Sequence, residues 1–258
     1  MCFDLDSHPP IRPIAGGALD AGHLTLTSAD GTVFNAFRAR AATPTGAGMI
    51  VLPDVRGLFP FYEELALRCA EQGIDAVAID YFGRTAGTDR RPPDFEYMPH
   101  VNQTTFAGLS ADIAAAAWYL RSPDGGGVSD LFTIGFCFGG RVSFDAATTG
   151  LGLAGVIGFY GPPTGPGRND APAPADVADR CGCPVLGLFG GADPGIPPES
   201  VAVFDAALAR AGVEHRIVTY DGAPHSFFDR KAADYAAASD AAWSEVLAFV
   251  RGHAQATA

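Results

Sequence analysis

The chain has 258 residues and a formal net charge of −12 at pH 7, and 48% of its residues are hydrophobic. That much apolar material can build one large domain or two small ones. The negative charge argues against nucleic acid or an anionic membrane as a partner. No apolar run reaches the roughly 20 residues that cross a bilayer. The N-terminal segment, MCFDLDSHPPIRP, is acidic and broken by proline, unlike a secretory signal, so we expect a cytoplasmic protein.

Cysteine usage limits the chemistry further. Five cysteines, an odd number, are scattered over a chain of this size, which argues against a disulfide framework. Cys181 and Cys183 form a Cys-Gly-Cys sequence, but no second pair of Cys or His at a fitting spacing accompanies them. We therefore expect neither a metal ion nor another cofactor.

The first pattern along the chain is a β-hairpin. After an N-terminal extension of residues 1–22, residues 23–40 form two alternating runs around Asp30-Gly31, a strong turn signal. Short apolar runs and helical periodicities then alternate. Strands are expected at residues 49–55, 74–80, 131–134, 153–161, 184–193 and 214–220, and helices at 61–72, 104–120, 141–148, 198–211 and 232–251.

This alternation predicts a single α/β domain over residues 23–258, with a mainly parallel sheet and helices on both faces. In such sheets ligands bind at the carboxyl ends of the strands, so chemistry is expected in the loops that follow them. Two long proline-rich segments, 83–103 and 161–180, interrupt the pattern. We expect residues 161–180 to form a surface excursion near the same edge.

Cys137 stands in the stretch GFCFGG, between a predicted strand and a predicted helix. The stretch fits the G-x-S-x-G nucleophile elbow, with cysteine in place of serine. Glycines on either side allow a close approach of helix to strand, and a helix N-terminus favours a thiolate. A free cysteine in this place can also be a small buried hydrophobic residue. The motif alone leaves both alternatives open.

Two later strand ends carry candidate partners for Cys137. Asp193 follows a buried strand in GLFGGADPGIP, and His225 follows the last strand in YDGAPHSFFD. Taken singly, Asp193 can be a turn former and His225 an ordinary loop histidine. Elbow hydrolases order their triad as nucleophile, acid and histidine. The order and the positions of the three residues therefore indicate a catalytic triad.

These residues resemble the dienelactone hydrolases of the α/β-hydrolase superfamily, from about Asp30 to the last helix. The resemblance rests on GFCFGG, GGADPGIP and APHSF, and on VLPDVRGL and DYFGR earlier in the chain. It implies an α/β-hydrolase fold: a mainly parallel central sheet flanked by helices on both faces. It also implies that Cys137 is the nucleophile, His225 the base and Asp193 the acid that orients it.

The resemblance further implies residues that bind the substrate. Asp54 matches an acidic residue, usually glutamate, that contacts the cysteine in the resting enzyme. Arg84 matches an arginine that binds the substrate carboxylate, and Ser226 matches the serine beside the histidine. Taken without the resemblance, Asp54 can be a polar strand end and Arg84 a solvated loop residue. A second family arginine, four residues after the histidine, is replaced by Asp229, with Arg230 one place later.

The expected reaction is ester cleavage through a thioester. The thiolate of Cys137 attacks the carbonyl, and the backbone N–H groups of Phe138 and Val55 stabilise the oxyanion. Water activated by His225 then hydrolyses the thioester. A thiolate is itself a good leaving group, so activated esters and enol lactones, which expel a stabilised enolate, suit it better than simple amides. Arg84 would favour substrates that carry a carboxylate.

We expect a small-molecule ester or lactone as the substrate, and a monomer or small homo-oligomer. Two alternatives stay open. The departures at Asp54 and Asp229 leave room for a general esterase or an acyltransferase on the same scaffold. A non-catalytic binding protein or thiol sensor could instead use Cys137 as a reactive thiol. A sensor usually needs a resolving cysteine nearby, and the sequence alone does not place Cys181 or Cys183 relative to Cys137.

Overall fold

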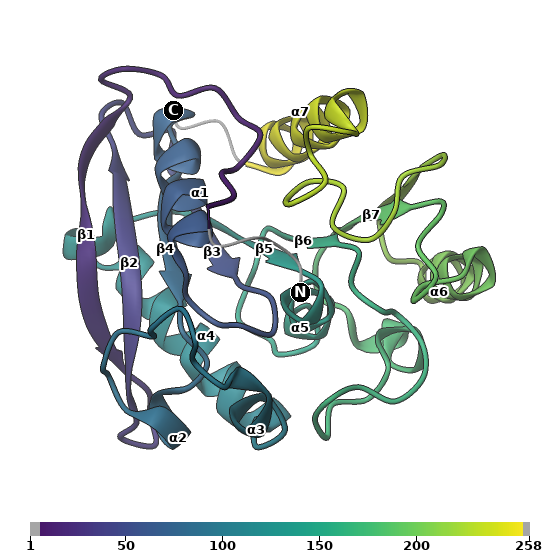
Figure 1. Ribbon diagram of the computed structural model, residues 1–258, viewed down its shortest axis with the longest axis horizontal. Coiled ribbons are helices and arrows are strands. Elements are labelled where there is room, and N and C mark those ends of the chain that lie inside the picture. The colour runs from purple at the N-terminus through teal and green to yellow at the C-terminus, as the bar shows by residue number, and fades with distance from the viewer. Residues whose placement is uncertain (1–5, 255–258) are drawn as a thin grey trace.

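The computed structural model describes residues 6–254, which form an eight-stranded sheet covered by helices (Figure 1). The strand order is β1-β2-β4-β3-β5-β6-β7-β8. β1 and β4 both pair antiparallel with β2, and all other pairs are parallel. The strands are β1 (Ala18–Thr27), β2 (Val33–Ala41), β3 (Ala47–Leu52), β4 (Asp75–Ile79), β5 (Asp130–Phe136), β6 (Gly155–Phe159), β7 (Val185–Gly190) and β8 (His215–Tyr220).

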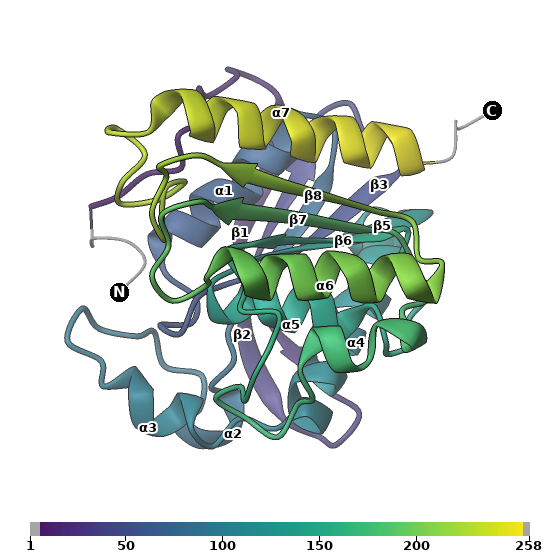
Figure 2. The same cartoon turned by 90° about the vertical axis from the view of Figure 1, so that its right-hand side faces the viewer.

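Helices cover both faces of the sheet. α1 and α7 lie on one face, and α4, α5 and α6 lie on the other (Figure 2). The helices are α1 (Pro60–Glu71), α2 (Gly83–Ala86), α3 (Tyr97–Val101), α4 (Phe106–Arg121), α5 (Phe138–Ala146), α6 (Pro198–Ala211) and α7 (Ala236–His253), with single 3-10 turns η1 (Pro123–Gly125), η2 (Pro174–Asp176) and η3 (Ala178–Arg180). The predicted α/β-hydrolase architecture is therefore present.

The central strands explain why the alternation could be read from the sequence. Every residue of β3 to β7 is buried, as expected for strands that carry helices on both faces. β1 alternates between more and less exposed positions, as an edge strand of a hairpin does. It begins at Ala18, ahead of the domain start expected at residue 23.

Two parts of the helical pattern differ from the expectation. α2 and α3 lie within the segment 83–103 and have only four and five residues, too few to show an apolar periodicity. α5 begins at Phe138, not at Arg141, and so includes Gly139 and Gly140. Glycine is a poor helix former, which is why the sequence placed the start after this pair. The shift puts Cys137 directly at the helix N-terminus.

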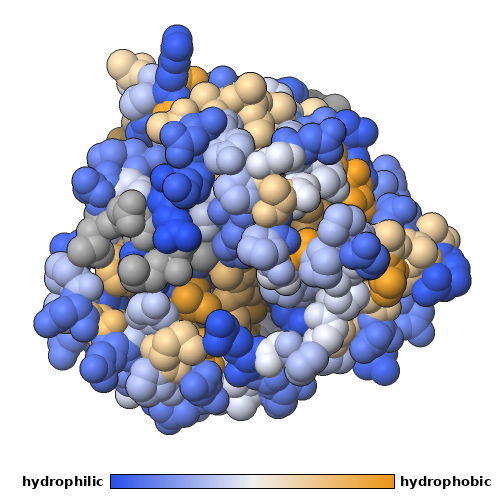
Figure 3. Space-filling view, turned by 45° about the vertical axis from the view of Figure 1, so that its right-hand side comes forward, coloured by the Kyte–Doolittle hydropathy of each residue, from blue (hydrophilic) through white to orange (hydrophobic). Residues whose placement is uncertain are grey.

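The surface is mainly hydrophilic on the face seen in Figure 3, where hydrophobic residues form small separate spots. Trp118 on α4 is the most exposed large hydrophobic side chain of the described residues, at 77%. No helix within residues 6–254 combines the length and the apolar character needed to cross a bilayer.

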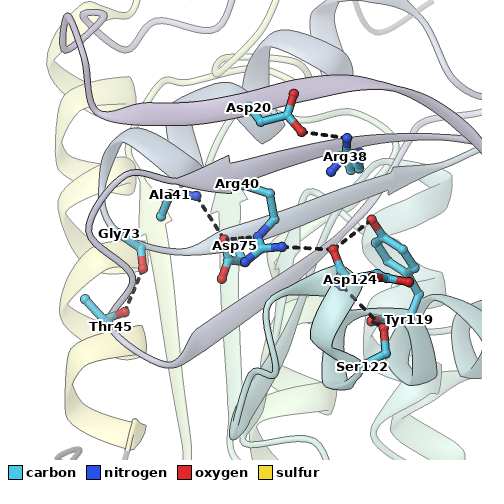
Figure 4. A network of polar contacts seen from close by, with 11 residues as sticks. Asp20, Arg38, Arg40, Ala41, Thr45, Gly73, Asp75, Tyr119, Ser122 and Asp124 are labelled. Carbon is cyan, nitrogen blue, oxygen red and sulfur yellow. Dashed lines mark hydrogen bonds and ion pairs between the residues drawn. The ribbon is translucent and has the colours of Figure 1, made fainter.

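A buried carboxylate ties the hairpin to the sheet at the start of β4 (Figure 4). Asp75 is 1% exposed, and its Oδ1 accepts hydrogen bonds from Arg40 Nε (3.1 Å) and from the Ala41 N–H (2.9 Å). Arg40 also donates to the carbonyl of Asp124 (2.9 Å). This end of the sheet is opposite the carboxyl ends of the parallel strands, so its charges serve packing.

We expect Asp75→Ala to lower the free energy of unfolding by about 2–3 kcal/mol, because it removes the acceptor of a buried N–H and the partner of Arg40. Asp20→Ala is the matched control. Asp20 also pairs with an arginine of β2, Arg38, but its side chain is 52% exposed, so a loss of about 0.5 kcal/mol is expected. Urea titration of both variants measures the difference. Equal losses would show that the burial of Asp75 does not matter.

Candidate active site

Cys137 lies between the end of β5 and the start of α5 with φ of 55° and ψ of −113°. A positive φ outside glycine costs of order 1–3 kcal/mol and persists only where the surroundings hold it. Here the Cys137 N–H donates to the Phe159 carbonyl on β6 (3.0 Å), and the Arg141 N–H donates to the Cys137 carbonyl (3.1 Å). This strained strand-to-helix corner has the form of a nucleophile elbow.

Two glycines make the corner possible by bringing backbones together. A Cβ on Gly139 would lie 2.2 Å from the carbonyl oxygens of both Leu52 and Pro53. A Cβ on Gly135 would lie 1.9 Å from the Gly139 carbonyl oxygen. Neither approach leaves room for any side chain, and the obstructing atoms are backbone. The glycines around Cys137 therefore have a steric reason.

Asp193 and His225 meet at the same edge of the sheet, from the loops after β7 and β8. His225 Nδ1 lies 2.6 Å from Asp193 Oδ2, and Asp193 Oδ1 accepts the Gly195 N–H (2.8 Å). The side chain of Asp193 is 2% exposed and that of His225 is 28% exposed. Because a carboxylate oxygen only accepts, Nδ1 carries the proton and Nε2 is the basic nitrogen. The structure thus pairs the acid and the histidine in the sense that a triad requires.

Tyr160, which the sequence did not single out, packs against His225. It follows β6 with φ of 37°, and its ring centroid lies 4.8 Å from that of the imidazole. Its hydroxyl donates to Asp229 Oδ2 (2.6 Å). Asp229 is 3% exposed, and burial raises the pKa of its carboxyl to about 8. The only sequence signal for Tyr160 was its place at a strand end.

Asp54 is completely buried in the turn after β3. Its Oδ1 accepts the Arg56 N–H (2.8 Å), and its own N–H donates to the Tyr62 hydroxyl (3.0 Å). Burial, followed by the charges of Asp54, Asp80 and Cys137, raises the pKa of the neighbouring Tyr81 well above its ordinary value. The contact of Asp54 with Cys137 stays a prediction.

Tyr81 forms part of the wall beside the elbow. Its hydroxyl donates to the Pro53 carbonyl (2.8 Å), and its ring packs edge-on against Phe138, with centroids 5.4 Å apart. The motif DYFGR drew attention to its arginine, while the structure places the tyrosine against Phe138, the residue after Cys137.

The two candidate oxyanion donors follow β3 and β5 at equal distances along the chain from a pair of neighbouring residues. Leu52 and Gly135 are paired across β3 and β5, and Val55 and Phe138 each follow three residues later. Phe138 opens α5, so its N–H belongs to the first turn, where no acceptor within the helix exists. The participation of both N–H groups in catalysis stays a prediction.

Arg84 has partners other than the substrate. In α2, its Nη1 donates to Asp112 Oδ2 (2.5 Å), while Nε and Nη2 donate to Asp30 Oδ2 (3.1 and 2.8 Å). Asp112 is 1% exposed and also accepts the hydroxyl of Ser28. The expected substrate-binding arginine is therefore clamped between the hairpin turn and α4.

Ser226 lies next to His225 with φ of 64° and is fully buried. Among the described residues, its hydroxyl has no hydrogen-bond partner. Its carbonyl accepts the N–H groups of Asp229 and Lys231 (both 3.2 Å), which closes the loop. Its contact with a substrate stays a prediction. No group of three or more potential metal ligands occurs within residues 6–254.

Comparisons with curated proteins identify the relatives of this chain. A protein of Escherichia coli O157:H7 named "Putative carboxymethylenebutenolidase" is 31% identical over 244 residues, which are 89% of this chain and 86% of that protein. A protein of Salmonella typhimurium with the same name is 31% identical over 245 residues, which are 90% of this chain and 87% of that protein.

Solved structures give the same picture. A crystal structure described as a "Putative Dienelactone Hydrolase" from Klebsiella pneumoniae has a TM-score of 0.76 at 27% identity, covering 90% of this chain and 99% of that one. A dienelactone hydrolase-like promiscuous phosphotriesterase from metagenomic libraries has a TM-score of 0.72 at 22% identity, covering 91% and 99%, which supports the fold alone. The model of the "Dienelactone hydrolase family" matches residues 35–254. This chain is a member of the dienelactone hydrolase family and has its α/β-hydrolase fold.

Proposed function

We propose that this chain is a cysteine hydrolase that cleaves activated esters or enol lactones through a thioester intermediate. The observation that carries the proposal is Cys137 on a strained elbow, at the sheet edge where His225 is hydrogen-bonded to Asp193 at 2.6 Å. The names of the relatives, dienelactone hydrolase and carboxymethylenebutenolidase, support the same substrate class.

In the first half of the reaction, the Cys137 thiol gives its proton to His225 Nε2, the sulfur forms a bond to the carbonyl carbon, and the carbonyl electron pair moves to oxygen. The N–H groups of Phe138 and Val55 stabilise this oxyanion, and one such donor is typically worth about 10²–10³ in rate. The intermediate then collapses to a thioester, and the C–O bond to the leaving group breaks. The leaving oxygen takes a proton from the imidazolium of His225 as it departs, or it leaves as a stabilised enolate that then takes this proton, and in both cases His225 becomes neutral again.

In the second half, His225 Nε2 takes a proton from water, and the oxygen of that water attacks the thioester carbon. The second tetrahedral intermediate expels the Cys137 thiolate and releases a carboxylic acid. Asp193 holds the imidazole in the tautomer with Nδ1 protonated and stabilises the cation that forms.

The leaving group decides which substrates suit this site. A thiolate leaves more readily than a simple alkoxide or an amide nitrogen, so an intermediate with a poor leaving group returns to the substrate. An enol lactone or activated ester expels a stabilised anion and proceeds to the thioester. The proposal therefore takes activated esters and lactones as substrates and disfavours simple amides.

A second candidate is a general esterase without a preference for carboxylates. The ion pairs of Arg84 favour it, because a substrate carboxylate would have to compete with Asp30 and with the buried Asp112. Asp229, in place of the second family arginine, adds no positive charge either. The expectation that Arg84 binds a substrate carboxylate stays a prediction, and its contacts argue for a structural role.

The burial of the other three cysteines that the structure describes weakens the thiol-sensor alternative. Burial raises the pKa of Cys181 to about 11 and that of Cys183 to about 12. A resolving thiol must be deprotonated to attack, so both would be slow at neutral pH. Cys69 on α1 is completely buried, and burial likewise raises its pKa to about 12.

Cys137→Ala should abolish turnover of an activated ester such as a nitrophenyl ester, because the variant lacks the attacking sulfur. Cys69→Ala is the control: it also removes a thiol, in the interior of α1, and should keep most of the activity. Circular dichroism checks that both variants fold. Normal rates in a folded Cys137→Ala protein would refute the cysteine hydrolase.

Asp193→Asn should lower kcat by about 10³–10⁴ while the protein stays folded. The amide cannot hold His225 with Nδ1 protonated as a carboxylate does, and it does not stabilise the imidazolium. Asp205→Asn, on the exposed side of α6 with a side chain 55% exposed, is the control and should be near normal. A loss of less than about tenfold in Asp193→Asn would assign the orienting role to another acid.

Arg84→Met should lower kcat/KM equally for a carboxylate-bearing lactone and for a neutral ester of similar size, and should lower the melting temperature. The reason is that the buried Asp112 loses its cation. Arg90→Met, with a side chain 73% exposed, should change neither quantity. A selective loss on the carboxylate-bearing substrate at fixed salt would instead make Arg84 a substrate-binding residue.

A further inference from the structure

The peptide bond between Pro53 and Asp54, just after β3, is held on both sides by tyrosine hydroxyls. Its carbonyl accepts a hydrogen bond from Tyr81 (2.8 Å), and its N–H donates to the hydroxyl of Tyr62 (3.0 Å). Asp54 and Tyr62 are completely buried, and Tyr81 is nearly so. Water therefore has little access to this peptide, and the two hydroxyls supply the partners that a buried backbone needs.

The turn that follows this peptide is closed by hydrogen bonds, with one exception. The Asp54 carbonyl accepts the Gly57 N–H (3.2 Å), and Asp54 Oδ1 accepts the Arg56 N–H (2.8 Å). Among the residues that the structure describes, the N–H of Val55 has no acceptor. An unpaired backbone N–H beside a buried turn calls for an explanation, and a catalytic role is one of the recognised ones. This N–H is the oxyanion donor expected from the sequence.

The direction of the Val55 N–H depends on the peptide that the tyrosines hold. The two successive peptide units are planar and share the Asp54 Cα, so a rotation of the first unit would displace the second. Tyr62 reaches the first unit from the first turn of α1, and Tyr81 reaches it from just after β4. Two separate elements of the fold thus hold the peptide that precedes the expected donor.

The same peptide also lies against the helix of the elbow. A Cβ on Gly139 would lie 2.2 Å from the Pro53 carbonyl oxygen, so the backbone of α5 passes close to the carbonyl that Tyr81 binds. The Tyr81 ring packs edge-on against Phe138, whose N–H is the other expected donor, with ring centroids 5.4 Å apart. Tyr81 therefore contacts the segments that carry both expected donors.

We propose that Tyr62 and Tyr81 are positioning residues for the oxyanion hole: their hydroxyls hold the Pro53–Asp54 peptide so that the Val55 N–H points to the oxygen of the tetrahedral intermediate. The inference rests on the proposed hydrolase function and adds two residues to it. Neither tyrosine needs to touch the reacting atoms. Both fix a donor in place before the negative charge develops, and such preorganisation is how an oxyanion hole accelerates a reaction.

The first test measures kcat/KM on an activated ester for Tyr62→Phe, Tyr81→Phe and the double variant. Phenylalanine keeps the ring and its packing and removes only the hydroxyl, so the effect reports on the hydrogen bond. Each single variant should lose about tenfold, because one of the two hydroxyls still holds the peptide. The double variant should lose about 10²–10³, as is typical when one oxyanion donor is lost.

Tyr119→Phe is the matched control. The Tyr119 hydroxyl also donates to a backbone carbonyl, that of Asp124 (3.3 Å), but at the opposite end of the sheet (Figure 4). This variant loses the same atom and should keep the wild-type kcat/KM. Circular dichroism and melting temperatures establish that each variant is folded under the assay conditions. If the double variant does not fold, the two single variants carry the test.

Two reagents separate oxyanion stabilisation from a general disturbance of the site. A trifluoromethyl ketone adds the Cys137 thiolate at its carbonyl carbon, and the carbonyl electron pair moves to oxygen, so the adduct carries an oxyanion. Iodoacetamide alkylates the same sulfur by displacement of iodide, and no oxyanion forms. The affinity for the ketone should fall by the same factor as kcat/KM. The rate of alkylation at Cys137, followed by mass spectrometry, should stay at the wild-type value.

Two results would overturn the inference. One is a folded double variant with the kcat/KM of the wild type, and the other is an equal loss in ketone affinity and in alkylation rate, which would indicate a general structural role. Absence of ester turnover in the wild type is a separate outcome that would refute the proposed function. The ketone affinities of the wild type and the variants would then decide the inference alone, and a wild type that does not bind the ketone would refute it.

Discussion

The close approach of the α5 backbone to the ends of β3 and β5 is the constraint on which the rest of the site depends. Gly139 can come within contact of the Leu52 and Pro53 carbonyls only because it has no Cβ. This approach forces Cys137 into a positive φ, and the hydrogen bond to Phe159 holds it there. Backbone contacts thus position Cys137, the proposed nucleophile.

The aspartates around the site differ in the partners of their carboxyl groups. Asp193 accepts hydrogen bonds from the Gly195 N–H and from the His225 imidazole, and so holds the histidine in place. Asp229 has a hydroxyl and one backbone N–H, and burial outweighs them. Asp80, at the end of β4, is paired with the nearly buried Arg91 at 2.6 Å. Of these three acids, Asp229 is the one with no ion-pair partner among the described residues.

The sequence predicted the parts of the fold in which burial leaves a repetitive pattern. The apolar runs of β3 to β7 could be read because both faces of these strands are covered, and α6 was placed at its observed bounds. The segment 83–103 gave no such pattern, so α2 and α3 were missed. Arg84 shows the limit most clearly. Its partners Asp30 and Asp112 lie 54 and 28 residues away, and no local pattern connects them.

The sequence by itself determined the α/β architecture, the elbow around Cys137 and the chain order of Asp193 and His225, because periodicity, glycine spacing and strand ends are local properties. Only the tertiary structure decided that His225 meets Asp193, that Tyr160 lies between His225 and Asp229, and that Arg84 is held by carboxylates. The contacts of His225 join loops after different strands, and those of Arg84 join α2 to the hairpin turn and to α4. The arrangement that brings them together follows from packing of the whole chain. Side-chain partners across such an edge depend on distances in space, which sequence separation does not encode.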